Sequence, residues 1–546
     1  MNSGIPQEKH APSGVVRSAG IVSIAVFSSR ITGLVREQVF AAFFGAGQIF
    51  DAFRIAFLIP NLTRDLFAEG ALSSAFVPIF TEYLSSRTKE DAARLASLVA
   101  SAIVIVVGGM CLLGMIFSPQ LVMLIAPGFQ RTPGKFELAV QLTRIMFPFL
   151  LLVALAAQAM GILNSLGQFG VAATASTMFN IGSLISGLLL GMVLGPHIGL
   201  GEIQGMAYGV VIGGALQFLW QVPSLRSAGF RFHPVIDWSD PGLRRILLMM
   251  GPAILGNAAV QINVSVNTNL ASGLGDGPVS WLGYAFRFMQ LPIGIFGFAI
   301  ASATLPAISR SAAAHNIPEF RSTLSKSLGI VFLLTLPSAV GLAVLGQSIV
   351  AAIYQMGHFT EFDTDQTARA LACYAVGLVG YSAVKVLNPA FYALKDSRTP
   401  MLVSLASIAI NSAVAFTTVN YLGLGHAGLA VSLSAVATFS ALALFVIMRN
   451  RIGGIHGRSL WSSFLKVAIA SAVMGAVVAA SSYGVHLNLG GSRVSHLIDL
   501  AVSIPLGLAT LYVACRLLGV PELESAVNAL AGPLRRRIPF LKGRSA

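Results

Sequence analysis

The chain has 546 residues and a net charge of +14, with 55% hydrophobic and only 10% charged residues. A soluble protein carries about 25% charged residues, and one soluble core does not grow to this length with so little polar surface. The composition therefore excludes a soluble enzyme and a soluble nucleic-acid-binding protein, and it indicates a polytopic membrane protein.

Residues 1–18 form a polar leader, and the apolar segment after them is too long for a cleaved signal peptide. A helix needs about 20 residues to cross the hydrocarbon layer, and we count about fourteen such segments. They are long and continuously apolar, which predicts an all-α integral membrane protein and not a β-barrel. The predicted spans are 19–44, 51–82, 95–117, 140–164, 171–195, 203–225, 244–272, 279–309, 326–355, 367–394, 400–422, 425–448, 463–486 and 496–518.

Every second connection between these spans is basic, which is the positive-inside pattern and accounts for the net charge without nucleic acid. The opposite connections are nearly devoid of lysine and arginine, and one of them carries Glu361, Asp363 and Asp365. With an even number of helices, both termini are predicted in the cytoplasm. The basic groups are Arg87, Lys89 and Arg94; Arg226, Arg231, Arg244 and Arg245; Arg310, Arg321 and Lys326; Lys395 and Arg398; Arg449, Arg451, Arg458 and Lys466; Lys9 and Arg17 in the leader; and Arg535, Arg536, Arg537, Lys542 and Arg544 in the tail.

An internal repeat predicts two six-helix lobes in the same orientation. Ala52-Phe53-Arg54 followed by Pro60 recurs as Ala285-Phe286-Arg287 followed by Pro292. Transporters with parallel repeats bind substrate between the halves. The predicted division is a leader at 1–18, an N-lobe at 19–226, a C-lobe at 244–449, two further helices at 460–518 and a basic cytoplasmic tail at 519–546.

The segment from Ser28 to Tyr83 places charges inside apolar sequence. A charged side chain near the bilayer centre costs at least about 2.5–3.5 kcal/mol, so such residues face a wet cavity, pair with one another or carry function. Arg30 and Glu37 share one helix face and could form a pair that only offsets its own burial. Arg36 shares that face only if Gly33 lets the helix bend.

The second span continues this pattern. Asp51 and Arg54 could form a local pair, and we interpret Arg54 as a snorkelling cation at the membrane interface. Pro60 and Asn61 are predicted to interrupt the helix just before Arg64. Arg30, Arg36, Arg64 and Arg287 would together present planar donors suited to phosphate oxygens.

Other polar and small residues have simpler explanations. The seventh span is polar, which interhelical hydrogen bonding explains; its polar residues are Asn257, Gln261, Asn263, Asn267 and Asn269. Gly187, Gly191 and Gly195 form a row of small residues that indicates helix packing. The three cysteines lie in apolar sequence and indicate neither disulfides nor a metal site. Enzyme motifs such as a P-loop or H-E-x-x-H are missing, so we expect a transporter without covalent chemistry and without a cofactor.

Several motifs resemble the MurJ (MviN) family of lipid II flippases in the MOP superfamily, and the resemblance covers essentially the whole chain. The most specific matching segments are Ser29-Arg30-Ile31-Thr32-Gly33-Leu34-Val35-Arg36 and Phe44-Gly45-Ala46-Gly47. The others are Asp51-Ala52-Phe53, Pro60-Asn61-Leu62, Phe67-Ala68-Glu69-Gly70-Ala71, Ala75-Phe76-Val77-Pro78, Phe147-Pro148-Phe149, Gly161-Ile162-Leu163-Asn164 and Phe391-Tyr392-Ala393. The resemblance implies fourteen helices and export of lipid II, the lipid-linked peptidoglycan precursor, across a bacterial inner membrane.

The resemblance also implies site residues. Arg30, Arg36, Arg64 and Arg287 match the essential cavity arginines of the family. Asp51, Asn61 and Glu69 match its motif positions, and Glu37 is expected to neutralise Arg36 and Arg287. Asp65 departs from members with a basic residue there. Asn267 and Ala415 stand where sodium-coupled members carry carboxylates, so no metal site is expected.

The main hypothesis is an alternating-access flippase whose partners are lipid II and membrane lipids. We expect the membrane potential to drive it, with Glu37 as a candidate for proton coupling. The rivals are a flippase for another undecaprenyl-linked glycan, a MATE-type cation antiporter and a scaffold that binds cell-wall synthesis proteins. A cation antiporter needs acidic cavity residues, whereas the buried charges here are mainly basic, and a scaffold needs no membrane-embedded arginines.

Overall fold

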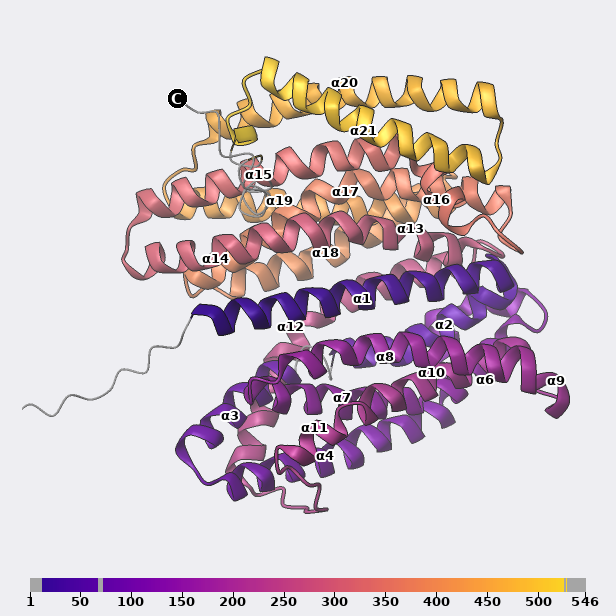
Figure 1. Cartoon of the computed structure of the whole chain (residues 1–546), viewed down its shortest axis with the longest axis vertical. Helices are drawn as coiled ribbons and strands as arrows, with labels where there is room; N and C mark the ends of the chain where they lie inside the picture. The colour runs from indigo at the N-terminus through magenta and orange to yellow at the C-terminus, as the bar shows by residue number, and fades with distance from the viewer. Residues whose placement is uncertain (1–11, 67–71, 525–526, 528–546) are drawn as a thin grey trace, which may run out of the picture. The chain divides into compact units, whose positions relative to one another are not determined.

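The structure is a computed structural model that describes residues 12–66, 72–524 and 527. Every regular element within these residues is helical, which confirms the predicted all-α fold (Figure 1). The chain divides into two compact units, Met1–Gln261 and Ile262–Ala546, and the division falls inside one long helix. Each unit is described by itself. The predicted lobes and tail have other boundaries and stay predictions.

Unit 1 contains the charged N-terminal segment. Its elements are α1 (Pro12–Phe44), α2 (Gln48–Arg64), α3 (Ser73–Ser86), α4 (Lys89–Ile116), α5 (Ser118–Ile125), the 3₁₀ helix η2 (Pro127–Arg131), α6 (Lys135–Met146), α7 (Pro148–Ser165), α8 (Phe169–Leu188), the π-helix η3 (Leu189–Leu194), α9 (Gly195–Ile198), α10 (Glu202–Leu219) and α11 (Val222–Ser227). Helix α12 (Pro241–Ser272) begins in unit 1 and ends in unit 2.

Unit 2 continues with helices that include two further π-helical turns, η4 and η5. Its elements are α13 (Pro278–Pro292), η4 (Ile293–Gly297), α14 (Phe298–Ala313), α15 (Ile317–Val344), α16 (Gly346–Tyr354), α17 (Glu361–Ala393), α18 (Arg398–Phe416), η5 (Thr417–Tyr421), α19 (Gly425–Arg451), α20 (Gly457–Leu489) and α21 (Arg493–Leu517).

Eleven of the described helices are long and apolar enough to cross a membrane. They account for the predicted spans from 95–117 to 203–225 and from 279–309 to 496–518. The other three predictions, 19–44, 51–82 and 244–272, fall on α1, on α2 with α3, and on α12, so the total of fourteen stays a prediction. The span predicted at 326–355 is wrong in its extent, because α15 ends at Val344 and α16 is a separate helix.

The glycine row confirms its predicted packing role in unit 1. Helices α8 and α10 lie side by side, as Figure 1 shows. A methyl group on Gly205 of α10 would lie 2.3 Å from the backbone nitrogen of Gly191, and one on Gly209 would lie 2.6 Å from the Cα of Gly187. Only glycine allows the two backbones to approach this closely. This close contact holds α8 against α10. Helix α8 in turn carries the side chains that contact α1.

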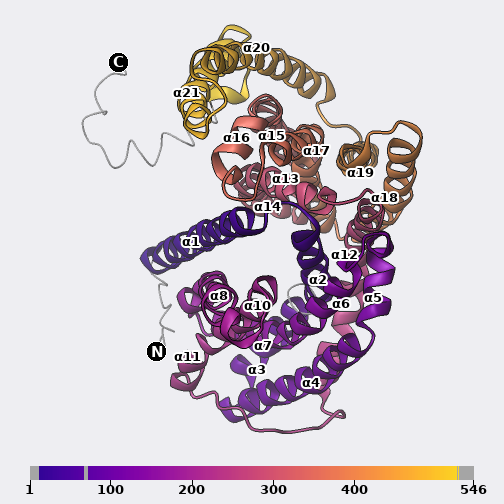
Figure 2. The ribbon, with the colours of Figure 1, turned by 90° about the vertical axis from the view of Figure 1, so that its right-hand side faces the viewer.

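The last two helices belong to unit 2. Helices α20 and α21 pack against each other, α20 also packs on α15, and α21 packs on α16 (Figure 2). Buried side chains at these contacts include Val467, Met474 and Cys515. Helices α20 and α21, which lie beyond the sequence repeat, therefore belong to the same unit as α13 to α19.

Candidate functional site

Arg36 and Glu37 form a buried ion pair on α1. Their side chains are 9% and 7% exposed, and Arg36 Nη2 lies 3.5 Å from Glu37 Oε1. The Arg36 guanidinium also lies 5.2 Å from the centroid of the Phe179 ring on α8. A desolvated guanidinium over an aromatic face gains cation–π energy. The predicted neutralisation of Arg36 by Glu37 is confirmed, and α8 helps to hold the cation in place.

Gly33 is the point at which α8 reaches α1. Asn180 Nδ2 donates a hydrogen bond of 3.0 Å to the carbonyl oxygen of Ser29, and it lies 3.4 Å from the position of a methyl group on Gly33. The same nitrogen lies 3.4 Å from Thr32 Oγ1. Because Asn180 follows Phe179 directly, one turn of α8 both fastens α1 and faces Arg36.

Arg30 differs from Arg36 because its side chain is exposed. Within residues 12–66 and 72–524 it makes no hydrogen bond or ion pair, so the alternative Arg30–Glu37 pair does not form. A cation in a predicted membrane span without a protein partner favours an anionic ligand or a polar surface. Arg30 is therefore the arginine of this set that is most open to an anion.

Asp51 forms a buried ion pair with Lys135, a residue that sequence reasoning missed. Lys135 Nζ lies 2.9 Å from Asp51 Oδ2, with side-chain exposures of 1% and 0%. The ammonium group also lies 4.3 Å from the centroid of the Phe129 ring. The pair joins the first turn of α2 to the first turn of α6. The signal in the sequence was a buried aspartate that needs a cation, but 84 positions separate the two residues.

Arg64 pairs with its neighbour Asp65. Arg64 Nη2 and Nε lie 2.8 and 3.2 Å from Asp65 Oδ1, and Gln261 Nε2 lies 3.5 Å from Asp65 Oδ2. The side chains are 21% and 32% exposed. Asp65 thus lowers the net positive charge beside Arg64. It also holds the Arg64 guanidinium in one position.

The predicted helix break at Pro60 and Asn61 is wrong. Helix α2 continues through Pro60 to Arg64, and half-buried Asn61 lies within it. Proline removes one backbone donor, and a helix tolerates the loss when the freed backbone groups find other partners. Thr63 Oγ1 donates to the carbonyl oxygen of Ile59, four positions earlier, at 3.2 Å. The helix instead widens into a π-turn at residues 65–66.

Two further predicted site residues are Glu69 and Arg287. Glu69 falls in residues 67–71, which are outside the described part of the chain. Arg287 is half-buried on α13 in unit 2, five positions before Pro292 and the π-helix η4. The repeat seen in the sequence therefore extends to local geometry, since both α2 and α13 contain a proline that precedes a π-turn.

Two of the polar residues of α12, Asn263 and Asn267, make the interhelical hydrogen bonds predicted for them. Asn263 Nδ2 donates to Ser407 Oγ of α18 at 3.1 Å. Asn267 Nδ2 donates to the carbonyl oxygen of Leu429 at 3.0 Å and to Ser432 Oγ at 3.1 Å, both on α19. The described residues contain no group of three histidine, cysteine, aspartate or glutamate side chains placed to hold a metal ion.

The local arrangements have one chemical property in common, which is basic donors held in largely apolar helices. Guanidinium groups are planar, stay charged and bind phosphate or carboxylate oxygens in a bidentate way. Unit 1 restrains Arg36 and Arg64 by carboxylates and leaves Arg30 open, while unit 2 presents Arg287. Within its own unit, each of these guanidinium groups is suited to bind and release an anionic group.

Comparisons with known proteins agree with this chemistry. The family model for the lipid II flippase MurJ matches residues 40–492. The lipid II flippase MurJ of Burkholderia cenocepacia is 34% identical over 451 residues, which cover 82% of this chain and 86% of that protein. The probable lipid II flippase MurJ of Vibrio cholerae is 34% identical over 531 residues, which cover 94% and 98% of the two chains.

Solved structures give the same picture. A lipid II flippase MurJ in an inward closed conformation matches with a TM-score of 0.74 and 27% identity, over 91% of this chain and 99% of that chain. An inward-facing MATE family transporter of the MOP superfamily matches with a TM-score of 0.61 and 17% identity, over 79% and 94% of the two chains. The second likeness shows a common fold alone.

Proposed function

Because the chain belongs to the MurJ family of lipid II flippases, we propose that it carries lipid II from the inner to the outer leaflet of the bacterial inner membrane by alternating access. It is a multi-pass membrane transporter and not an enzyme. The substrate is a pyrophosphate-linked lipid, so the protein needs cations for the head group and an apolar surface for the tail.

The observation that carries this proposal is the set of arginines in otherwise apolar helices, above all Arg30, which is exposed and pairs with no residue in the described part of the chain. Arg36, Arg64 and Arg287 are proposed to contact the pyrophosphate at stages of the same cycle. Glu37, Asp51, Asn61 and Glu69 are proposed as charge partners and gating residues. A carboxylate beside an arginine lowers the affinity for the anion, which favours release after transport. A cation antiporter would need the opposite charge in these positions.

Lipid binding tests the head-group assignment. Purified protein in detergent is mixed separately with three lipids: lipid II, the same lipid without its sugar, and another undecaprenyl-linked glycan. The amounts of each complex are then compared by native mass spectrometry. Arg30→Gln removes a charge-assisted contact worth about 1.5–3 kcal/mol, so lipid II affinity is expected to fall about tenfold or more. Arg245→Gln is the matched control, since Arg245 pairs with Glu82 and is 57% exposed.

Three results would decide against parts of this assignment. Equal affinity of wild type and Arg30→Gln for lipid II would remove Arg30 from the binding site. A preference for the other glycan would keep the flippase and change its substrate. If Arg36→Ala and Arg287→Ala left cell-wall synthesis intact, a scaffold for cell-wall synthesis proteins would become the better explanation.

We place both termini in the cytoplasm, because every second connection between the spans is basic. A pyrophosphate that moves outward then moves with an inside-negative potential, which gives about 2.3 kcal/mol per charge per 100 mV. We therefore propose that the membrane potential drives transport. Transport in liposomes at equal sodium should follow an imposed potassium diffusion potential. A strict sodium requirement without voltage dependence would contradict this, and a proton dependence abolished by Glu37→Gln would assign coupling to Glu37.

A further inference from the structure

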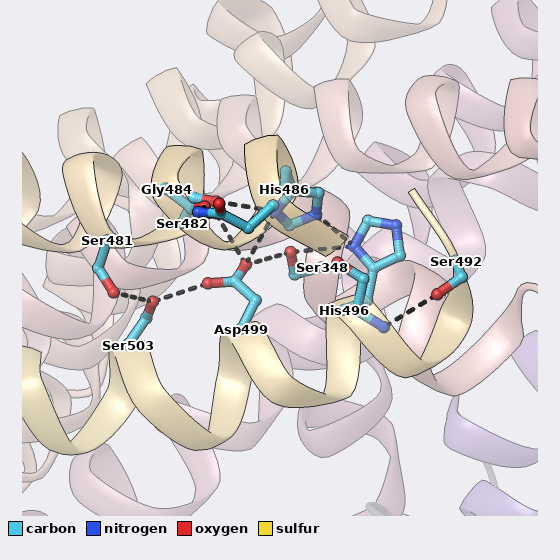
Figure 3. Close-up of polar contacts among 11 residues, drawn as sticks. Ser348, Ser481, Ser482, Gly484, His486, Ser492, His496, Asp499 and Ser503 are labelled. Carbon is cyan, nitrogen blue, oxygen red and sulfur yellow. Dashed lines mark hydrogen bonds and ion pairs between the residues drawn. The ribbon is translucent and has the colours of Figure 1, made fainter. Parts of the chain in front are cut away.

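A polar cluster around a buried aspartate joins three helices of unit 2, and its outermost member, His486, has a side chain that is 28% exposed. It contains His486 and Ser482 of α20, His496 and Asp499 of α21, and Ser348 of α16 (Figure 3). Asp499 is fully buried, and His496 is 5% exposed. Both α20 and α21 are apolar enough to cross a membrane. Ionisable groups inside such helices are costly and commonly serve a function.

Three hydroxyl groups donate to the Asp499 carboxylate. Ser482 Oγ lies 2.7 Å from Oδ2, Ser503 Oγ lies 2.7 Å from Oδ1, and Ser348 Oγ makes a short hydrogen bond to Oδ2. These donors are neutral, so they solvate the carboxylate without balancing its charge. In the described part of the chain no lysine or arginine pairs with Asp499. The group placed to balance it is His486, whose Nδ1 lies 4.0 Å from Asp499 Oδ2.

The hydrogen bonds of the two imidazoles define where protons can sit. His486 Nδ1 lies 2.8 Å from the carbonyl oxygen of Ser482, which only accepts, so this nitrogen carries a hydrogen. His486 Nε2 lies 2.9 Å from His496 Nδ1, and one hydrogen must lie between them. If both rings are neutral, His496 donates it. If one extra proton is bound, it lies on His496 Nε2, and the hydrogen between the rings either stays on His496 Nδ1, which makes His496 the imidazolium, or moves to His486 Nε2, which makes His486 the imidazolium.

The same heavy-atom arrangement therefore accepts two protonation states that differ by one proton. In the state with the extra proton, the charges of the imidazolium and of Asp499 cancel inside an apolar environment. A second extra proton would place two N–H groups opposite each other and break the link between the rings. The cluster thus has room for one added proton and not for two.

A metal ion fits this arrangement poorly. Two nitrogen ligands at about 2.0–2.1 Å from a tetrahedral zinc ion stand about 3.3 Å apart, whereas His486 Nε2 and His496 Nδ1 lie 2.9 Å apart, at hydrogen-bond distance. The rings also point these nitrogens at each other (Figure 3). The geometry suits a shared proton.

Few other charges face the cluster. On α21, the Nε of Arg493 donates to the carbonyl oxygen of Ala352 at 3.1 Å, which adds a second tie between α21 and α16. Helix α17, which packs on α16, begins with a further carboxylate, Glu361. Ser348 is the contribution of α16, and it lies 3.2 Å from His496 Nδ1. The principal counter-charge to the imidazoles remains Asp499.

We propose that His486, His496 and Asp499 form a proton-binding site in the C-terminal helix pair, which holds one proton shared between the two histidines and balanced by Asp499. The site is separate from the arginines assigned to the lipid head group, and it does not depend on which lipid is carried. Because Ser348 takes part, uptake and loss of the proton occur at the contact that ties α21 to α16.

The test uses the full chain with ¹⁵N-labelled histidine in lipid nanodiscs, followed by solid-state NMR between pH 5 and pH 9. Nine histidines are present, and the variants His486→Gln and His496→Gln assign the two signals. The signals of both residues should shift together in one transition of one proton. In Asp499→Asn the midpoint should fall by about one to three pH units, because an anion near the imidazoles is removed. His456→Gln, an exposed histidine beside the start of α20, should leave the transition unchanged.

Two outcomes would overturn the proposal. Independent titration of the two histidines in the wild-type protein would exclude a shared proton, and this result needs no variant to fold. An unchanged midpoint in a folded Asp499→Asn protein would exclude the aspartate as the balancing charge. Neither outcome bears on lipid transport, so a failure here is distinct from a failure of the flippase assignment.

Discussion

Lys135 Nζ lies 2.9 Å from Asp51 Oδ2, and both side chains are almost completely shielded from solvent. Removing one member of such a pair leaves a buried charge without compensation, which costs about 3–5 kcal/mol. Lys135→Met should therefore lower the thermal unfolding midpoint strongly. The double variant Lys135→Met/Asp51→Leu should recover most of the loss, because no charge is then left buried.

The exposed pair of Arg245 and Glu82 is the matched control for this experiment. Its side chains are 57% and 50% exposed, and surface pairs contribute about 0–1 kcal/mol. Arg245→Met should hardly change the unfolding midpoint. If the double variant at positions 51 and 135 were as unstable as the single one, Asp51 and Lys135 would contribute through other contacts and not mainly through their mutual pairing.

Gly205 should tolerate no side chain. A methyl group there would lie 2.3 Å from the backbone nitrogen of Gly191, so α8 and α10 would have to separate. Overpacking of this kind costs about 1–3 kcal/mol, and Gly205→Ala should unfold at lower temperature than the wild type. Gly109→Ala on α4 meets no atom within 4 Å and should be as stable as the wild type. Equal effects of the two changes would show that the close approach is not needed.

Asp396 should make the C-terminal ends of α17 and α19 sensitive to acid. Hydrogen bonds from Thr399, followed by the charge of Arg451, hold the pKa of this carboxyl below its ordinary value of 3.8. Since the folded pKa is depressed, its stabilising contribution is fully present above about pH 4 and is lost as the pH falls through the folded value.

The measurement is the thermal unfolding midpoint of the protein in nanodiscs between pH 6 and pH 3. Wild type should lose stability in the acid part of this range, and Asp396→Asn should be less stable at neutral pH with a smaller further loss on acidification. An identical acid profile of both proteins would show that Asp396 does not contribute to the pH dependence.

Periodicity and composition were sufficient to predict the helical membrane fold, because each span must satisfy its own backbone in lipid. The sequence also predicted the Arg36–Glu37 pair, the packing of the glycine row and the hydrogen bonds of Asn263 and Asn267. The first prediction concerns two adjacent residues. The other two concern residue types, glycine and asparagine, that commonly mediate contacts between membrane helices. The break predicted at Pro60 was wrong, because a proline removes only one backbone donor and α2 continues through it to Arg64.

Contacts between distant segments could not be predicted in this way. The partner of Asp51 lies 84 positions away, and nothing in the sequence near Lys135 points to α2. The cluster around Asp499 also depends on tertiary packing, since Ser348 comes from α16, 151 positions earlier. The sequence analysis singled out neither this aspartate nor the two histidines, because only the packing of α16, α20 and α21 brings them together.

The most direct measurement is the movement of fluorescent lipid II between leaflets of liposomes that contain the purified protein. Wild-type protein should accelerate the loss of label from one leaflet, Arg30→Gln should slow it at least about tenfold, and Arg245→Gln should match the wild type. Folded, inserted wild-type protein that moved no lipid II, or that moved it equally well without Arg30, would contradict the proposed function or its binding site respectively.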